Sequence, residues 1–189
     1  ISLEGYYKSI GGLTRFYNLV NYNIQDIFYG TATSYGIDFF IKKGFLKHSA
    51  WISYSYGKTM ERFQYQNFYN TRRAPQDQRH ELKFATMLNF DPIYCSSTYI
   101  YGSGFPYENN MSFNQDDIQA YSRLDISIIY KFLDRKLKGE AGISILNVLN
   151  TKNLKYESFE KIPKSQTTGI NIVTEALPIT PTFFLKIWL

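Results

Sequence analysis

The sequence predicts an all-β protein whose antiparallel strands form a segment of a transmembrane β-barrel. The clearest observation is a long segment, about 119–132, in which two kinds of residue alternate. The even positions from 124 to 132 are apolar, whereas Arg123, Asp125 and Lys131 stand at odd positions, where Ile129 is the exception. Strands of soluble domains usually have about 5–6 residues. A longer strand that is apolar on one side and charged on the other is typical of a wall between lipid and water.

Composition is the second observation that favours a barrel. Aromatic residues make up 18% of the 189 residues, with 17 Tyr and 15 Phe. Tyrosine suits membrane interfaces, because its ring is apolar and its hydroxyl group can stay in water. The mean hydropathy is -0.31, and the chain contains no run of about 18 apolar residues that would form a membrane helix. Barrel strands keep the mean hydropathy low, because every second residue faces the lumen.

The first four strands are expected at residues 1–10, 30–43, 48–60 and about 78–90. The first begins at once with apolar and aromatic residues. In the second, Ile37 and Ile41 oppose Asp38, and in the third Ile52 opposes Ser53. In the fourth, apolar residues at positions 82, 84, 88 and 90 share a face, and the other face holds Glu81, Lys83, Ala85, Met87 and Asn89. This period of two is the signature of half-buried strands.

The last four strands are expected at about 93–104, 119–132, 139–146 and 178–189. Asp91-Pro92 is a turn signal that separates the fourth strand from the fifth. A polar turn at 133–138 joins the sixth strand to the seventh, in which Ala141, Ile143 and Ile145 share one face.

Connection lengths are the third observation. Long connections, at about 11–29, 61–77, 105–119 and 150–177, alternate strictly with short turns. Outer-membrane barrels have this arrangement, with short turns on the periplasmic side and long loops outside. Inside the last connection, Leu154–Glu157 and Gly169–Val173 are short β-prone runs that predict a small hairpin.

Charge and motifs argue against several other functions. The net charge is +5, but the basic residues are scattered and form no stripe, so we do not expect nucleic acid as a partner. Cys95 is the only cysteine, and His48 and His80 lie on different expected strands. A zinc site needs three or four ligands at suitable spacing, and no catalytic or phosphate-binding motif occurs. We therefore expect no enzyme activity, no cofactor and no metal.

Four segments, in the right order along the chain, resemble TonB-dependent outer-membrane receptors, especially those of Bacteroidota. Arg73–Leu82 resembles the start of a descending strand, and Tyr101–Tyr107 is similar to the strand-to-loop passage that follows. Gly142–Asn150 resembles the penultimate strand with its Asn-x-x-Asn element, and Pro181–Leu189 resembles the closing strand.

The resemblance implies a barrel of about 22 strands with an N-terminal plug domain inside it. Residues 1–189 would be the C-terminal part of that barrel, in the outer membrane of a Gram-negative bacterium, and we expect a fragment without plug or signal peptide. The implied function is energised uptake of a scarce solute: a ferric siderophore, haem, cobalamin or an oligosaccharide. The implied partners are the lipid bilayer, the TonB complex through the plug, the barrel-assembly machinery and a surface lipoprotein.

The closing strand carries the residues that the assembly machinery would recognise, and these are Phe183, Leu185, Ile187 and Leu189. Members of the family usually end on an aromatic residue, whereas here Trp188 precedes a terminal leucine. Phe184 and Trp188 then share the lumenal face with Lys186. Either that face packs against the plug, or the register shifts near the end of the strand.

Two groups of residues are candidate sites. The lumenal group would line the solute path and hold the plug, or would be a charge ladder that keeps the wet wall neutral; its members are Glu81, Lys83, Arg123, Asp125 and Lys131. The loop group would contact the ligand through aromatic rings, or would pack each loop on its neighbours; its members are Phe63, Tyr65, Phe68, Tyr69, Phe105, Tyr107 and Phe113. The segment 77–80 would contact ligand at the barrel mouth or anchor a strand start.

Two other interpretations remain open. A complete eight-stranded outer-membrane protein would pair residues 1–10 with residues 178–189. A secreted, soluble, carbohydrate-binding β-sandwich would have short strands, and a second protein layer would cover one face of each.

Overall fold

A computed structural model describes residues 1–19, 24–65, 68–106, 119–133, 138–161 and 169–188. This part of the chain is all-β, and none of it forms a helix long and apolar enough to cross a membrane. The strands are β1 (Ser2–Leu19), β2 (Ile24–Phe45), β3 (His48–Tyr65), β4 (Phe68–Arg73), β5 (His80–Phe90), β6 (Ile93–Gly102), β7 (Tyr121–Leu133), β8 (Lys138–Leu146), β9 (Leu154–Lys161), β10 (Gly169–Glu175) and β11 (Thr180–Trp188).

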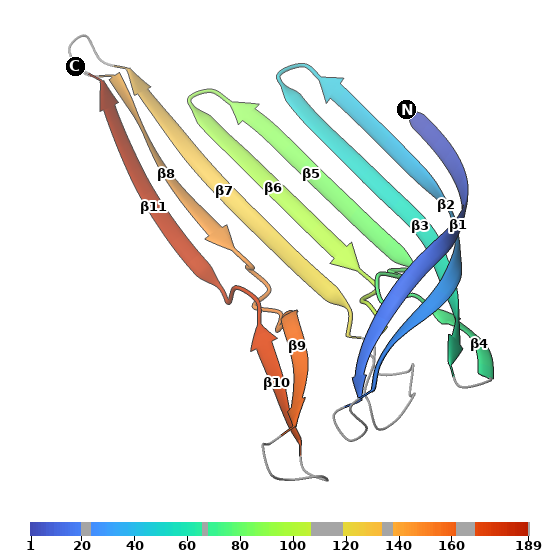
Figure 1. Cartoon of the computed structure of the whole chain (residues 1–189). Helices are drawn as coiled ribbons and strands as arrows, with labels where there is room; N and C mark the ends of the chain where they lie inside the picture. Colours follow the sequence, from blue (N-terminus) through green and yellow to red (C-terminus); the bar gives the residue numbers. More distant parts are fainter. Residues whose placement is uncertain (20–23, 66–67, 107–118, 134–137, 162–168, 189) are drawn as a thin grey trace.

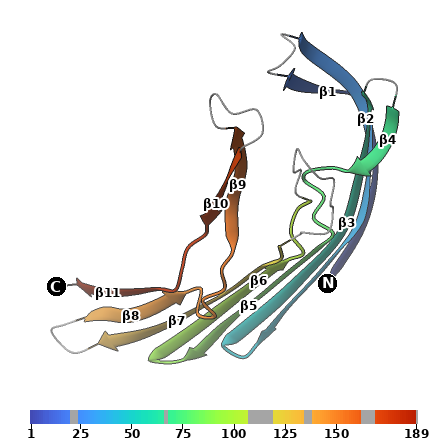
Figure 2. The ribbon, with the colours of Figure 1, turned by 90° about the horizontal axis from the view of Figure 1, so that it is seen from below.

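Nine of the strands form one antiparallel meander sheet, which confirms the predicted all-β antiparallel class (Figure 1). The order in the sheet is β1-β2-β3-β5-β6-β7-β8-β11, with β4 paired to the far end of β3. The sheet is curved but open: β1 and β11 are its two edges and do not pair with each other (Figure 2).

Two of the expected long loops were wrong, because most of their residues are paired strand. β1 and β2 pair as far as Leu19 and Ile24, and β3 continues to Tyr65 and pairs with β4. A β-bulge explains the first error. The register shifts between Ile10 and Leu13, and Gly12 has a φ of 70°. A bulge adds an unpaired residue. Residues after it therefore point to the opposite side from the one that the alternation before it predicts.

The small hairpin predicted in the last long connection is confirmed. β9 and β10 pair with each other and form a separate two-stranded sheet. Figure 2 shows this hairpin rising from the concave side of the main sheet.

The register separates two faces of opposite character, as the alternation predicts. Cross-strand partners in an antiparallel sheet point to the same side. One row of partners across β2, β3, β5, β6 and β7 is uncharged: Ile41, Ile52, Phe84, Tyr99 and Leu124. The adjacent row points to the other side: Lys42, Trp51, Ala85, Thr98 and Asp125. We call these sides the apolar face and the charged face.

The closing strand keeps this division to its end. β11 pairs with β8 from Thr180 to Trp188 without a register shift. Phe183, Leu185 and Ile187 therefore belong to the apolar face, and Phe184, Lys186 and Trp188 belong to the charged face. The register shift considered for this strand does not occur.

Aromatic rings lie over glycines on neighbouring strands of the sheet. A Cβ atom on Gly36 would touch the carbonyl oxygen of Tyr56 and the ring of Tyr6, its cross-strand partner. A Cβ on Gly142 would lie 2.5 Å from the ring of Phe184. Because glycine has no side chain, the aromatic ring of the neighbouring strand can lie flat on the backbone there and fill the space that a second side chain would take.

Replacing Gly36 with alanine is expected to lower the free energy of unfolding by about 1–3 kcal/mol, the usual cost of overpacking. Gly5→Ala is the matched control, since the nearest atom to its added Cβ is 3.9 Å away; it should be neutral or slightly stabilising. Denaturant unfolding followed by tryptophan fluorescence measures both. Equal midpoints for the two variants would show that the ring over Gly36 is not tightly packed.

Candidate functional site

All five predicted lumenal residues lie on the charged face. Arg123 donates to both carboxylate oxygens of Asp125, at 2.8 and 2.7 Å, and Lys83 forms an ion pair with Glu81. The Nζ atom of Lys131 lies 4.4 Å from the ring centre of Tyr94. In each of the two ion pairs the partners stand two residues apart on one strand, so their charges cancel locally. The charged face therefore carries mixed charge along these strands.

The carboxylates are confined to one side of the sheet. Among the described side chains of β1, β2, β3, β5, β6, β7, β8 and β11, every carboxylate lies on the charged face: Glu4, Asp38, Glu61, Glu81, Asp125 and Glu140. The fully charged residues that the same strands place on the apolar face are all basic; Lys43 lies near the end of β2, and Lys58 and Arg62 lie in the second half of β3.

Three asparagines, spaced by three residues, hold the base of the β9–β10 hairpin. Asn147 is 0% exposed. Its amide nitrogen donates to the carbonyl oxygens of Thr151 and Leu177, both at 3.0 Å, and its backbone N–H donates to Asp125 at 2.9 Å. Because Thr151 precedes the hairpin and Leu177 follows it, the side chain of Asn147 joins the hairpin's entry to its exit, and the backbone N–H of Asn147 joins both to the charged face.

The other two asparagines extend this clamp. Asn153 is 1% exposed and acts as a strand partner for Ser122: its Oδ1 accepts from the Ser122 N–H at 2.8 Å, and its Nδ2 donates to the Ser122 carbonyl at 2.9 Å. Asn150 accepts from the backbone N–H of Ile179 at 3.2 Å. We call Asn147, Asn150 and Asn153 the asparagine clamp.

A buried aspartate anchors the connection between β4 and β5. Asp77 is 2% exposed, and its Oδ2 accepts from Arg73 and Arg79, both at 2.7 Å. Its Oδ1 accepts from the backbone N–H of Thr59 at 2.7 Å. A carboxylate held by three donors is not available to a ligand. Of the two interpretations of segment 77–80, this geometry favours the strand-start anchor for Asp77.

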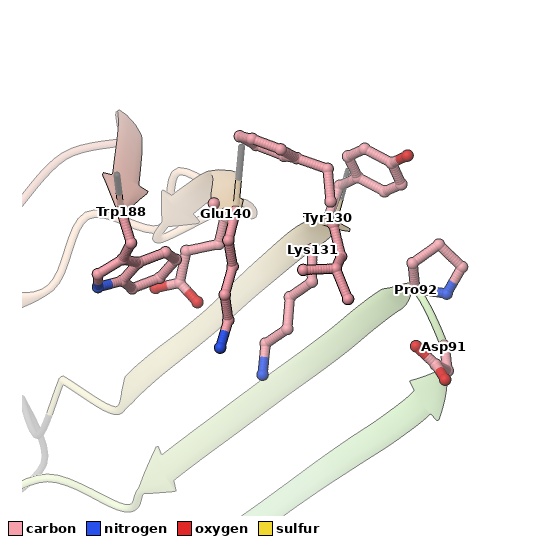
Figure 3. A pocket seen from close by; sticks show the side chains of 10 residues that line it. Asp91, Pro92, Tyr130, Lys131, Glu140 and Trp188 are labelled. Atoms are coloured by element: carbon pink, nitrogen blue, oxygen red, sulfur yellow. The ribbon is translucent and has the colours of Figure 1, made fainter. Parts of the chain in front are cut away.

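A pocket of about 930 Å³ opens at the short-turn end of β7, β8 and β11 (Figure 3). The side chains of Lys131, Glu140 and Trp188 extend to one side of the sheet there, and Tyr130 extends to the other. Lys186 forms an ion pair with Glu140 at 3.1 Å. The pocket thus combines an indole surface with charges of both signs, and its lining contains one of the predicted lumenal residues, Lys131.

The predicted loop aromatics are not brought together by the described structure. Phe63 belongs to β3, is 2% exposed and packs over Gly30. Phe105 follows β6 and is 55% exposed. The structure gives only the backbone pairing of three others in β3 and β4: Tyr65, Phe68 and Tyr69. Three predicted site residues lie outside the described residues: Tyr107, Phe113 and Leu189.

The asparagine clamp has a recognisable sequence pattern, which is separate from the alternation of polar and apolar residues. Asn147-x-x-Asn150-x-x-Asn153 is a regular spacing, and asparagine tolerates the left-handed backbone conformation. Asn147 and Asn150 adopt it, with φ values of 52° and 49°. Within the described ranges, no three His, Cys, Asp or Glu side chains lie close enough to hold a metal ion.

Comparison with known proteins gives no relative: no protein-family model matches the sequence, and neither a curated protein nor a solved structure matches it.

Replacing Asn147 with glycine is expected to lower the free energy of unfolding by about 1–3 kcal/mol, because it removes a buried amide group that donates to two part-buried carbonyl oxygens. It should also speed protease cleavage in the β9–β10 hairpin. Asn150→Gly is the matched control, since both positions have positive φ and glycine adds no strain at either, but Asn150 is exposed and supplies one bond. Urea unfolding and mass mapping of protease cuts measure both effects. Equal losses in the two variants would contradict the clamp.

Proposed function

We propose that this chain forms part of the wall of an outer-membrane transport barrel of the TonB-dependent receptor type, which takes up a scarce solute by energised transport. The observation that carries the proposal is the sorting of charge between the two faces of one long sheet. The apolar face lacks carboxylates among the described side chains, whereas the charged face carries ion pairs along several strands.

The exposure of the apolar face supports a lipid environment. Ile128 is 45% exposed, Leu185 63% and Phe183 73%, and no described segment forms a second layer over them. In water, exposed apolar area of this kind costs about 25 cal/mol per Å². Hydrocarbon removes that cost, because lipid chains then cover the side chains.

The height of the uncharged band also fits a membrane. Lys43 of β2 pairs with Ala50 of β3, and Lys58 lies eight residues further along β3 on the same face. Eight residues span about 26 Å along a strand, and a tilt of about 40° leaves about 20 Å across the membrane, close to the apolar band of about 25 Å in known barrels. Lysine stems can reach outwards from such a band to the headgroups.

The two free edges favour a large barrel. β1 and β11 present backbone groups without strand partners in the described sheet, and lipid does not tolerate such edges. Further strands would have to close the wall, which supports a receptor barrel over a complete eight-stranded protein. Strands of 18 and 22 residues, β1 and β2, are also far longer than those of a soluble sandwich.

In this proposal the charged face lines the lumen, and the clamp and the Asp77 anchor fix the hairpin and connections at the long-loop end. The plug would contact the lumenal wall, and TonB would act on the plug with energy from the inner-membrane proton gradient. The assembly machinery would recognise β11, and a surface lipoprotein would meet the long-loop end.

Uptake measured in cells tests the proposal. Cells that make the whole protein should accumulate one labelled solute among ferric siderophore, haem, cobalamin and oligosaccharide, and cells that lack the gene should not. A proton uncoupler should reduce this accumulation to the level of the deletion strain. Uptake that continues undiminished with the uncoupler, or no difference for any of the four solutes, would contradict energised transport.

A further inference from the structure

The long-loop end of the apolar face has a basic border built on tyrosines. Lys58 of β3 pairs with Tyr35 of β2, and its Nζ atom lies 5.9 Å from the centre of that ring. Two residues earlier on the same face, Tyr56 pairs with His80 of β5, and their rings lie 5.3 Å apart. The hydroxyl of Tyr54 is 2.8 Å from Nδ1 of His80. We call Tyr35, Tyr54, Tyr56, Lys58 and His80 the basic rim.

The charge of this rim is not balanced by the part of the protein that the structure describes. Lys58 has no carboxylate partner there, and the apolar face supplies none. Two nearby carboxylates on β3 and the β4–β5 connection are already engaged. Glu61 is paired with Arg72 at 2.8 Å, and Asp77 is held by two arginines. No described carboxylate therefore neutralises Lys58, and its ammonium group can meet an anion from outside the described protein.

We propose that the basic rim binds the phosphate group of an anionic lipid headgroup, in the membrane leaflet at the long-loop end. This inference rests on the proposed function, because it needs the apolar face to meet lipid. A lipid molecule fits both parts of this surface. Its acyl chains cover the apolar band, and its phosphate group reaches the basic rim at the edge of that band. The lysine ammonium is a good phosphate partner, and tyrosine hydroxyls at an interface can donate further hydrogen bonds.

The sign of the rim favours an anionic lipid over a neutral one. The two charged residues that β3 places at this end of the apolar face, Lys58 and Arg62, are both basic. A basic residue near an anionic membrane surface strengthens binding about fivefold. A zwitterionic headgroup carries a cation beside its phosphate and would gain much less.

Native mass spectrometry of the whole protein, purified in dodecyl maltoside and titrated with phosphatidylglycerol or phosphatidylcholine, tests the proposal. The protein should bind phosphatidylglycerol several-fold more tightly than phosphatidylcholine. Lys58→Gln should weaken phosphatidylglycerol binding about fivefold, and Lys58→Arg should keep it within twofold. Lys83→Gln, on the charged face, is the matched control and should also stay within twofold.

The proposal is overturned if Lys58→Gln binds like the natural protein, if Lys83→Gln loses as much, or if the two lipids bind equally. Should Lys58→Gln fail to fold, the affinity of the natural protein for phosphatidylglycerol is compared in 50 and 500 mM salt. A several-fold weaker affinity at high salt supports the basic rim, and an unchanged affinity refutes it. Uptake by cells carrying the same variants tests the proposed transport function separately from lipid binding. If uptake is sensitive to the uncoupler but Lys58→Gln binds lipid like the natural protein, the basic rim is refuted and the transport function is not.

Discussion

A single constraint organises the described sheet: carboxylates are kept off one face of it. Because side chains alternate strictly along a strand, the carboxylates within one strand must stand an even number of residues apart. The register between neighbouring strands must then be kept across eight strands, so that these positions stay on one side of the sheet. A slip of one residue between β5 and β6 would place Glu81 or Lys83 among the aromatic side chains. The continuous register from β2 to β11 is therefore what gives the sheet two faces of different character.

The long-loop end satisfies its backbone groups by a different means. Strand pairing stops there, and buried polar side chains take its place. Asn153 supplies a donor and an acceptor to Ser122 as a neighbouring strand would, and Asp77 accepts the N–H of Thr59 just before the first residue of β5. Both side chains are almost fully buried, and each is satisfied by several partners. Such groups fix where the sheet ends and where the hairpin begins.

The sequence predicts most of this architecture because alternation is a direct result of strand geometry. Strand existence and the sides of Arg123 and Asp125 follow from it, and the β9–β10 hairpin follows from two short β-prone runs. The ends of β1 and β2 do not, because the bulge beside Gly12 changes the phase of the pattern. The clamp and the Asp77 anchor depend on contacts between residues up to 31 positions apart, such as Ser122 and Asn153, which no local pattern contains. The loop aromatics were assigned from composition alone, and the burial of Phe63 shows how a ring in an expected loop can belong to a strand.

The most direct test uses the single natural cysteine, which β6 places on the apolar face between Leu88 and Ile128. A spin label on Cys95, in the whole protein reconstituted into lipid vesicles, should relax with oxygen, which concentrates in hydrocarbon, and not with a water-soluble nickel chelate. A label on Ser96→Cys, in a Cys95→Ser background, should show the opposite response because it lies on the charged face. If the label on Cys95 meets the nickel chelate, or is shielded from both reagents by protein, the apolar face does not touch lipid and the account is wrong.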